Sequence, residues 1–196
     1  KVNLLKKKKN FLLTILFSFF LAFVLLNRIK TSQKWARHMN IKDGRYDVAI
    51  MLKKYSEKKY TMAVTEAGLL PLYSRWKAVD TYGYNDSWIA QNKRINKAYL
   101  SKISPEIIMW HEFFSPLSPP KEERKNNPWF KMVKVLKEYA EENDYILVAV
   151  YGVWSDNTHY YYVKSNFPEK DEIISAIREM DYYWYESGEK SKNYYE

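Results

Sequence analysis

The chain has 196 residues and a formal net charge of +9, and its length suits one domain with an appendage. Seven of the 32 basic residues and none of the 23 acidic residues fall in residues 1–30, so the rest of the chain is nearly neutral and we expect no nucleic-acid partner. The absence of Cys excludes disulfides, zinc–thiolate sites and cysteine nucleophiles.

Residues 11–26, FLLTILFSFFLAFVLL, form an uncharged apolar run that follows four lysines. A helix over this run is about 24 Å long, and flanking lysines can snorkel to cover the rest of a hydrocarbon core of about 30 Å. A secretory signal peptide has the same order, but no small-x-small cleavage site follows here. We therefore expect a retained transmembrane helix, with the N-terminus in the cytoplasm and the domain outside.

The first half of the expected domain alternates helical and strand-like patterns. Helical spacing of apolar residues and short apolar runs predict, in order, a helix, two strands and a helix over residues 46–55, 62–64, 77–79 and 87–101. The two strands end at Glu66 and Asp80, and Asn85 or Asp86 can cap the second helix.

The second half predicts a strand, a long proline-rich loop, a helix, a hairpin and a last helix. These lie over residues 105–110, 113–128, 129–143, 145–163 and 168–180. The order favours a small α/β domain with a mixed sheet flanked by helices. We assign residues 1–30 to the basic flank and membrane helix, 31–185 to the extracytoplasmic domain and 186–196 to a frayed tail. Neither a GxGxxG nor a GxxxxGK[ST] loop is present.

The stretch between the first strand and the second helix contains a recognisable pattern. It holds Glu66-Ala67-Gly68, then Pro71 and Tyr73-Ser74, then Asp80–Asp86 with the sequence DTYGYND. This pattern resembles the region after the last membrane helix of polytopic GT-C-class glycosyltransferases, which use lipid-linked sugars and include mannosyl- and arabinosyltransferases. Leu72 and Tyr84 depart from that pattern, where an aromatic residue and Leu are common.

The resemblance implies a membrane-anchored extracytoplasmic domain of such an enzyme, or one accessory to it, that positions the acceptor or roofs the active site. Its expected partners are the bilayer, a lipid-linked sugar, and a glycan or protein acceptor. In that class the catalytic acidic residues lie in the first extracytoplasmic loop, and these 196 residues contain no such loop. The resemblance therefore assigns no catalytic residue and leaves open whether the chain is an enzyme by itself.

Four residues of this stretch, Glu66, Tyr73, Asp80 and Asp86, are candidates for binding substrate. A carboxylate can accept hydrogen bonds from sugar hydroxyls, and loop residues after strands often belong to binding sites. The alternative is structural: Asp86 caps a helix, Asp80 ties a loop, and Glu66 accepts bonds from backbone amides at the turn.

His111 and Glu112 end the third expected strand and complete the candidate set. If this strand runs parallel to the first, they lie near Glu66, and the three side chains could act as metal ligands or as an acid–base set. The alternative places His111 in a hydrogen bond under the following loop. No HExxH or similar spacing occurs, so the sequence predicts neither a metal nor a cofactor. His159, among three tyrosines, is expected to pack in an aromatic cluster.

Two further functions stay open beside the glycosyltransferase role. An anchored hydrolase or metal-assisted enzyme would need Glu66, His111 and Glu112 to converge. A module that binds cell-surface glycan or a protein would need an exposed aromatic platform, for which Tyr160–Tyr162 and Trp184 are the candidates. We also expect residues 113–128 to form a mobile loop that acts as a lid.

Overall fold

A computed structural model of the chain describes residues 14–30, 42–112, 127–155 and 157–195. Two compact units are present, Lys1–Ile41 and Lys42–Glu196. The first contains a helix over residues 14–30. Among the described residues, no helix combines the length and the apolar character that a membrane crossing requires. Residues 11–13, 31–41 and 113–126 lie outside the described part, so the membrane span and the lid loop stay predictions.

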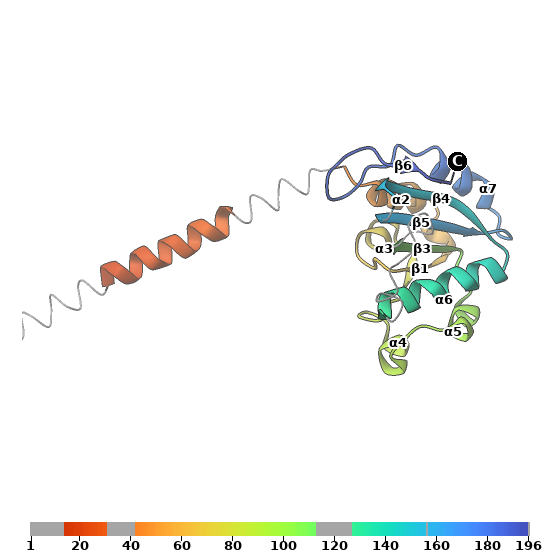
Figure 1. Cartoon of the computed structure of the whole chain (residues 1–196), viewed down its shortest axis with the longest axis horizontal. Coiled ribbons are helices and arrows are strands. Elements are labelled where there is room, and N and C mark those ends of the chain that lie inside the picture. Colours follow the sequence, from red (N-terminus) through yellow and green to blue (C-terminus); the bar gives the residue numbers. More distant parts are fainter. Residues whose placement is uncertain (1–13, 31–41, 113–126, 156, 196) are drawn as a thin grey trace, which may run out of the picture. The chain divides into compact units, whose positions relative to one another are not determined.

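The second unit is built on one six-stranded mixed sheet in the order β2-β1-β3-β5-β4-β6 (Figure 1). Its strands are β1 Thr61–Val64, β2 Lys77–Asp80, β3 Ile107–Glu112, β4 Tyr145–Trp154, β5 Asn157–Lys164 and β6 Lys192–Asn193. β1 pairs in parallel with β2 and β3, whereas the β3–β5, β4–β5 and β4–β6 pairs are antiparallel. The expected α/β class with a mixed sheet and flanking helices is confirmed.

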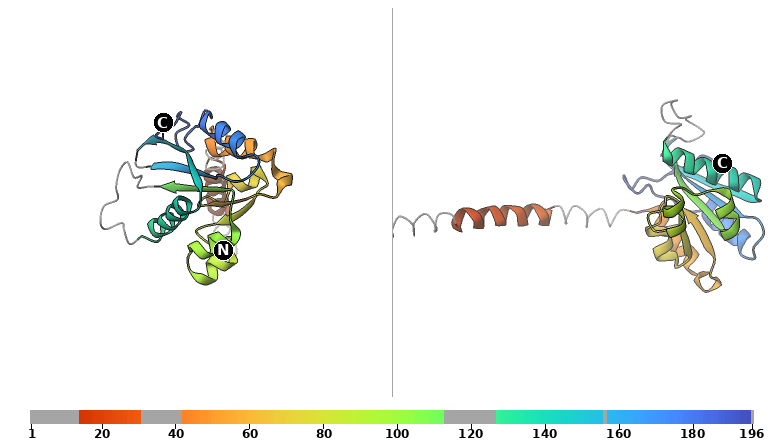
Figure 2. Two further views of the ribbon diagram at one scale, coloured as in Figure 1. Left: turned by 90° about the vertical axis from the view of Figure 1, so that its right-hand side faces the viewer. Right: turned by 90° about the horizontal axis from the view of Figure 1, so that it is seen from below.

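Helices cover both faces of this sheet (Figures 1 and 2). They are α2 Gly44–Lys53, η1 Ser56–Lys58, α3 Leu69–Ser74, α4 Ser87–Asn92, α5 Lys97–Ile103, α6 Pro128–Glu142 and α7 Lys170–Arg178. Side chains from α2, α3 and α7 pack on one face against Met62, Met109 and Tyr161. Side chains from α4, α5 and α6 pack on the other face against Trp110 and Tyr160. Alternation along each strand sorts residues between the two cores.

Two predicted segments differ from the structure. The helix expected over residues 87–101 is two helices, because Lys93 adopts a left-handed backbone with φ of 65° and the Asn96 side chain caps a new helix by accepting from the Tyr99 amide. The tail expected to fray is also partly ordered. Asn193 in β6 lies opposite Tyr151, and its side chain accepts a hydrogen bond from the Val150 amide.

The two connections that leave the parallel strands β1 and β2 run in opposite directions across the sheet, so the strand order reverses at β1. From β1 the chain runs through α3 to β2 on one side, and it then returns through α4 and α5 to β3 on the other side of β1. In such sheets the crevice at the carboxyl ends of the two diverging strands is the usual ligand site. The antiparallel β5 begins at this same edge, and its His159 lies opposite His111 of β3.

Candidate metal centre

Three side chains meet at this edge: Glu66, His111 and His159. One ligand atom from each lies within 4.8 Å of the other two. Glu66 Oε1 is 3.0 Å from His111 Nδ1 and 4.0 Å from His159 Nε2. The two imidazoles are buried, while the Glu66 side chain keeps 21% of its exposure and connects the cluster to the surface. The sequence thus places one carboxylate and two imidazoles at the end of the parallel strands.

Strand geometry explains why these residues converge and why Glu112 does not join them. Side chains alternate between the faces of a strand, so His111 lies on the face of Met109, and His159 lies on the face of Tyr161. Glu112 follows His111 and therefore belongs to the opposite face, with Trp110 and α6. The expected set of Glu66, His111 and Glu112 is corrected here: His159 replaces Glu112.

Each imidazole is oriented by a bond to its other ring nitrogen. His111 Nε2 is hydrogen-bonded to Asn157 Oδ1, which can only accept, so this nitrogen carries the proton and Nδ1 presents a lone pair to Glu66. Nδ1 and Glu66 Oε1 are then two acceptors 3.0 Å apart. A proton or a metal ion must lie between them, because two lone pairs at this distance repel.

The second imidazole is held in a comparable way. His159 Nδ1 lies 2.7 Å from the Tyr182 hydroxyl, which is in turn 2.9 Å from the Tyr161 hydroxyl. His159 Nε2 is buried and has no hydrogen-bond partner among the described residues. Metal-binding histidines typically have this arrangement, with one nitrogen bonded to a neighbouring group and the other directed at the ion.

The surroundings favour the neutral form of both imidazoles, which is the form that binds metal. Burial lowers the pKa of His111, and the nearby Arg45 acts in the same direction against the hydrogen bond with Asn157. Burial holds the pKa of His159 well below its usual value, and the positive charge of Arg45 acts in the same direction.

Arg45 at the start of α2 orients the carboxylate. Its guanidinium contacts Glu66 Oε2 and lies 2.8 Å from Asp43 Oδ2, and it packs 4.1 Å from the ring centre of Tyr185. Gly44 allows the start of α2 to pack against Tyr182, since a Cβ there would lie 2.4 Å from the Tyr182 ring. With Oε2 bound to the guanidinium, Oε1 is directed at the imidazoles.

Aromatic side chains close the cluster from the sides. Trp184 stacks on His159 with 4.4 Å between ring centres, and the Trp129 indole donates to the His111 carbonyl at 2.9 Å. Tyr160, Tyr161, Tyr162 and Trp184 are all buried. They therefore form no exposed platform for a glycan, and the binding-module hypothesis loses the feature that it required.

The ligand set fits a transition metal better than a hard cation. Two imidazoles and one carboxylate are the protein ligands of many catalytic zinc sites and of mononuclear non-haem iron sites, each of which leaves positions for water or substrate. In a tetrahedral zinc site the ligand atoms are about 3.3 Å apart. The Glu66–His111 distance already matches, and Glu66 and His159 would have to approach by less than 1 Å.

Asp80 and Asp86 are placed at the same edge but serve the backbone. Asp80 is buried and accepts four hydrogen bonds, from the amides of Tyr82, Gly83 and Asn85 and from the Asn85 side chain. Asp86 caps α4 by accepting from the Ile89 amide at 2.9 Å, and it also accepts from a tyrosine hydroxyl. These bonds agree with the structural alternative for both residues.

Tyr73 was a candidate from the sequence, whereas His159 was not. Tyr73 lies in α3, is 41% exposed and packs edge-on against Tyr46, with ring centres 4.8 Å apart. His159 was missed as a site residue. The signal that could have found it is its position near the start of a strand that follows a turn, but only the β3–β5 register brings it opposite His111.

Comparison with known proteins gives a family and no activity. A family model described as a domain of unknown function, DUF8728, matches residues 37–165, a range that includes Glu66, His111 and His159. No curated protein and no solved structure shows significant similarity to the chain. The likeness to GT-C-class glycosyltransferases, with its lipid-linked sugar and bilayer partners, stays a prediction.

Proposed function

The chain belongs to the DUF8728 family, and we propose that it is a metal-dependent hydrolase whose ion is bound by Glu66, His111 and His159. The observation that carries the proposal is the unpartnered, buried Nε2 of His159 beside the Glu66–His111 pair. Buried polar atoms are nearly always bonded, and each exception needs an explanation. A bound ion explains this nitrogen and also separates the two facing acceptors of Glu66 and His111.

The residues around the ion have separate roles in this proposal. Asn157 and Tyr182 orient the two imidazoles through their outer ring nitrogens, and Arg45 orients the carboxylate. Glu66, His111 and His159 would hold the ion with a position left open, and the ion would supply Lewis-acid activation of an ester or phosphoester and of a water molecule. Glu66 lies on the exposed side of the cluster, so substrate would approach from there.

The test is metal binding by the full chain, followed by hydrolysis. We expect the chelator-treated protein to take up one Zn²⁺ or Fe²⁺ per chain by calorimetry and elemental analysis, and to lose this uptake in Glu66→Gln and His159→Gln. Asp86→Asn is the matched control, since Asn is an equally good helix cap and Asp86 lies outside the cluster.

Two outcomes would overturn parts of the proposal. If the wild-type chain binds no metal above the level of Glu66→Gln, the cluster is a buried polar network and the proposal fails. If it binds one ion but the loaded protein hydrolyses none of a panel of carboxyl, phosphate and glycosidic esters faster than Glu66→Gln does, the ion is structural and the hydrolase assignment is wrong.

A further inference from the structure

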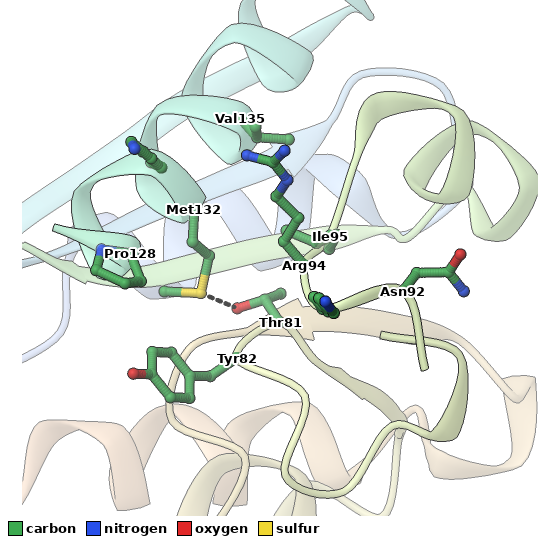
Figure 3. A pocket seen from close by; sticks show the side chains of 10 residues that line it. Thr81, Tyr82, Asn92, Arg94, Ile95, Pro128, Met132 and Val135 are labelled. Atoms are coloured by element: carbon green, nitrogen blue, oxygen red, sulfur yellow. Dashed lines mark hydrogen bonds between the residues drawn. The ribbon is translucent and has the colours of Figure 1, made fainter. Parts of the chain in front are cut away.

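A second candidate site is a cavity on the face of the sheet opposite to the Glu66–His111–His159 cluster. Its volume is about 510 Å³, within the range of small-molecule sites. It lies between the segment that follows β2, the α4–α5 connection and the first half of α6 (Figure 3). Its lining residues are Thr81, Tyr82, Asn92, Lys93, Arg94, Ile95, Pro128, Lys131, Met132 and Val135.

The charged residues in the described lining of this cavity are all basic. Lys93, Arg94 and Lys131 line it, and none of the described residues in its lining is acidic. All three are exposed, and none of them forms an ion pair with the described residues, although the next lysine of α6, Lys134, is 3.8 Å from Glu138. Positive charge without local compensation in a hollow attracts and retains anions.

The rest of the lining is apolar and aromatic. Ile95 and Met132 are buried in the floor, where the Thr81 hydroxyl lies 3.4 Å from the Met132 sulfur. Tyr82 is 39% exposed at the rim. Figure 3 shows the Arg94 side chain extending from the α4–α5 connection in the direction of α6.

We propose that this cavity binds the phosphate or diphosphate group of a small molecule that also carries a ring or apolar part. A guanidinium binds phosphate oxygens in a bidentate manner, and two lysines add point charges from separate elements. The buried floor and the Tyr82 ring give the non-ionic part of such a ligand a surface to pack against. This site is independent of the metal centre, because it uses other residues on the other face of the sheet.

The experiment is calorimetric titration of the full chain with inorganic pyrophosphate and inorganic phosphate, at low salt and with a chelator present. The chelator prevents an ion at Glu66 from recruiting the anion. We expect saturable binding that is tighter for pyrophosphate and weaker at high salt. In the double variant Arg94→Gln/Lys131→Gln the affinity falls by about tenfold or more, the loss expected when charge-assisted bonds to phosphate are removed.

Lys134→Gln is the matched control, because it removes one exposed lysine from the same helix outside the cavity. It should change the affinity by less than about twofold. Amide NMR shifts near Thr81 and Arg94 that follow the titration locate the site in the folded protein. Absence of binding, or equal losses in Lys134→Gln and the double variant, overturns the proposal. Binding only to vesicles that contain phosphatidic acid also overturns it, because the protein would then recognise the headgroup phosphate of a lipid and not a small molecule.

Discussion

Two groups of carboxylates lie at the same edge of the sheet and are used differently. Asp80 and Asp86 bond to backbone amides of the turn and helix that follow β2. Glu66 contacts the side chains of Arg45 and His111 and has a second imidazole close by. A carboxylate that satisfies backbone donors fixes the local chain, whereas one that faces imidazole lone pairs has coordination chemistry available. The difference lies in the partners and not in the residue type or the position.

The largest effect should follow from removing a ligand. His159→Gln deletes the imidazole that has no bonding partner at Nε2. We expect metal affinity to fall by more than about 100-fold, beyond the usual cost of losing a group that only supports a ligand. Competition with a chromophoric chelator measures this change. An affinity close to that of the wild type would show that His159 is packed in the aromatic cluster without binding metal.

Asp80→Ala tests the structural role of the carboxylates that bond to backbone amides. This change leaves three backbone amides at the β2 turn without their acceptor, and we expect the free energy of unfolding to fall by roughly 3 kcal/mol. Urea denaturation measures it. Metal affinity of the folded variant should stay within about twofold of the wild type, since Asp80 has no bond to the cluster. A large loss of affinity with little loss of stability would reverse the roles assigned to the two groups.

The two histidines of the cluster should make stability depend on pH. Both cluster histidines have a folded-state pKa below the usual 6.5, so the unfolded chain binds more protons once the pH falls below about that value. Stability of the metal-free protein should therefore be complete above pH 6.5 and decline below it, by at most about 1.4 kcal/mol per pH unit for each proton. Urea denaturation at several pH values measures the slope. The same slope in His159→Gln would exclude His159 as its source.

A smaller effect is expected from Tyr182→Phe. The change removes the hydroxyl that bonds His159 Nδ1 and keeps the ring, which stacks on Tyr151 at 4.3 Å. Loss of such an orienting bond typically weakens metal binding by about tenfold. The same chelator competition measures it, with Tyr151→Phe as a control hydroxyl that bonds the end of α7 instead. Equal effects of the two changes would indicate general loosening of the core.

Asp86→Ala should produce the smallest change. The cap of α4 is lost, and so is the acceptor of the Tyr99 hydroxyl, with a cost of about 1 kcal/mol in the free energy of unfolding. Thermal unfolding in the presence and absence of metal measures it. We expect the same decrease in both conditions, since the cap is not coupled to the ion. A decrease seen only with metal would connect Asp86 to the centre.

Much of this arrangement follows from local patterns in the sequence. The apolar runs at β1 and β4 and the spacing in α6 predict these elements, and the turn chemistry of Asp86 predicts its cap. The contact between Glu66 and His111 also follows, because the carboxyl ends of neighbouring parallel strands meet at one edge.

The rest depends on long-range register. Whether His111 or Glu112 faces Glu66 is decided by the alternation of β3 against its two cores, and a shift of one residue would exchange them. His159 and Tyr182 reach the site from 48 and 71 positions beyond His111, through an antiparallel pairing and a loop that no local pattern specifies. The division of the expected helix at Lys93 likewise depends on a single left-handed residue.

The most direct measurement is anomalous X-ray diffraction at the zinc edge from crystals of the full chain grown with Zn²⁺. We expect one peak at about 2.0–2.2 Å from Glu66 Oε1, His111 Nδ1 and His159 Nε2, with a non-protein ligand in the open position. Arg45 should remain on Glu66 Oε2, and Asn157 and Tyr182 should remain on the outer ring nitrogens. The absence of a peak among these three atoms at saturating Zn²⁺, or a zinc ion bound elsewhere while His159 Nε2 stays unbonded, would contradict the account.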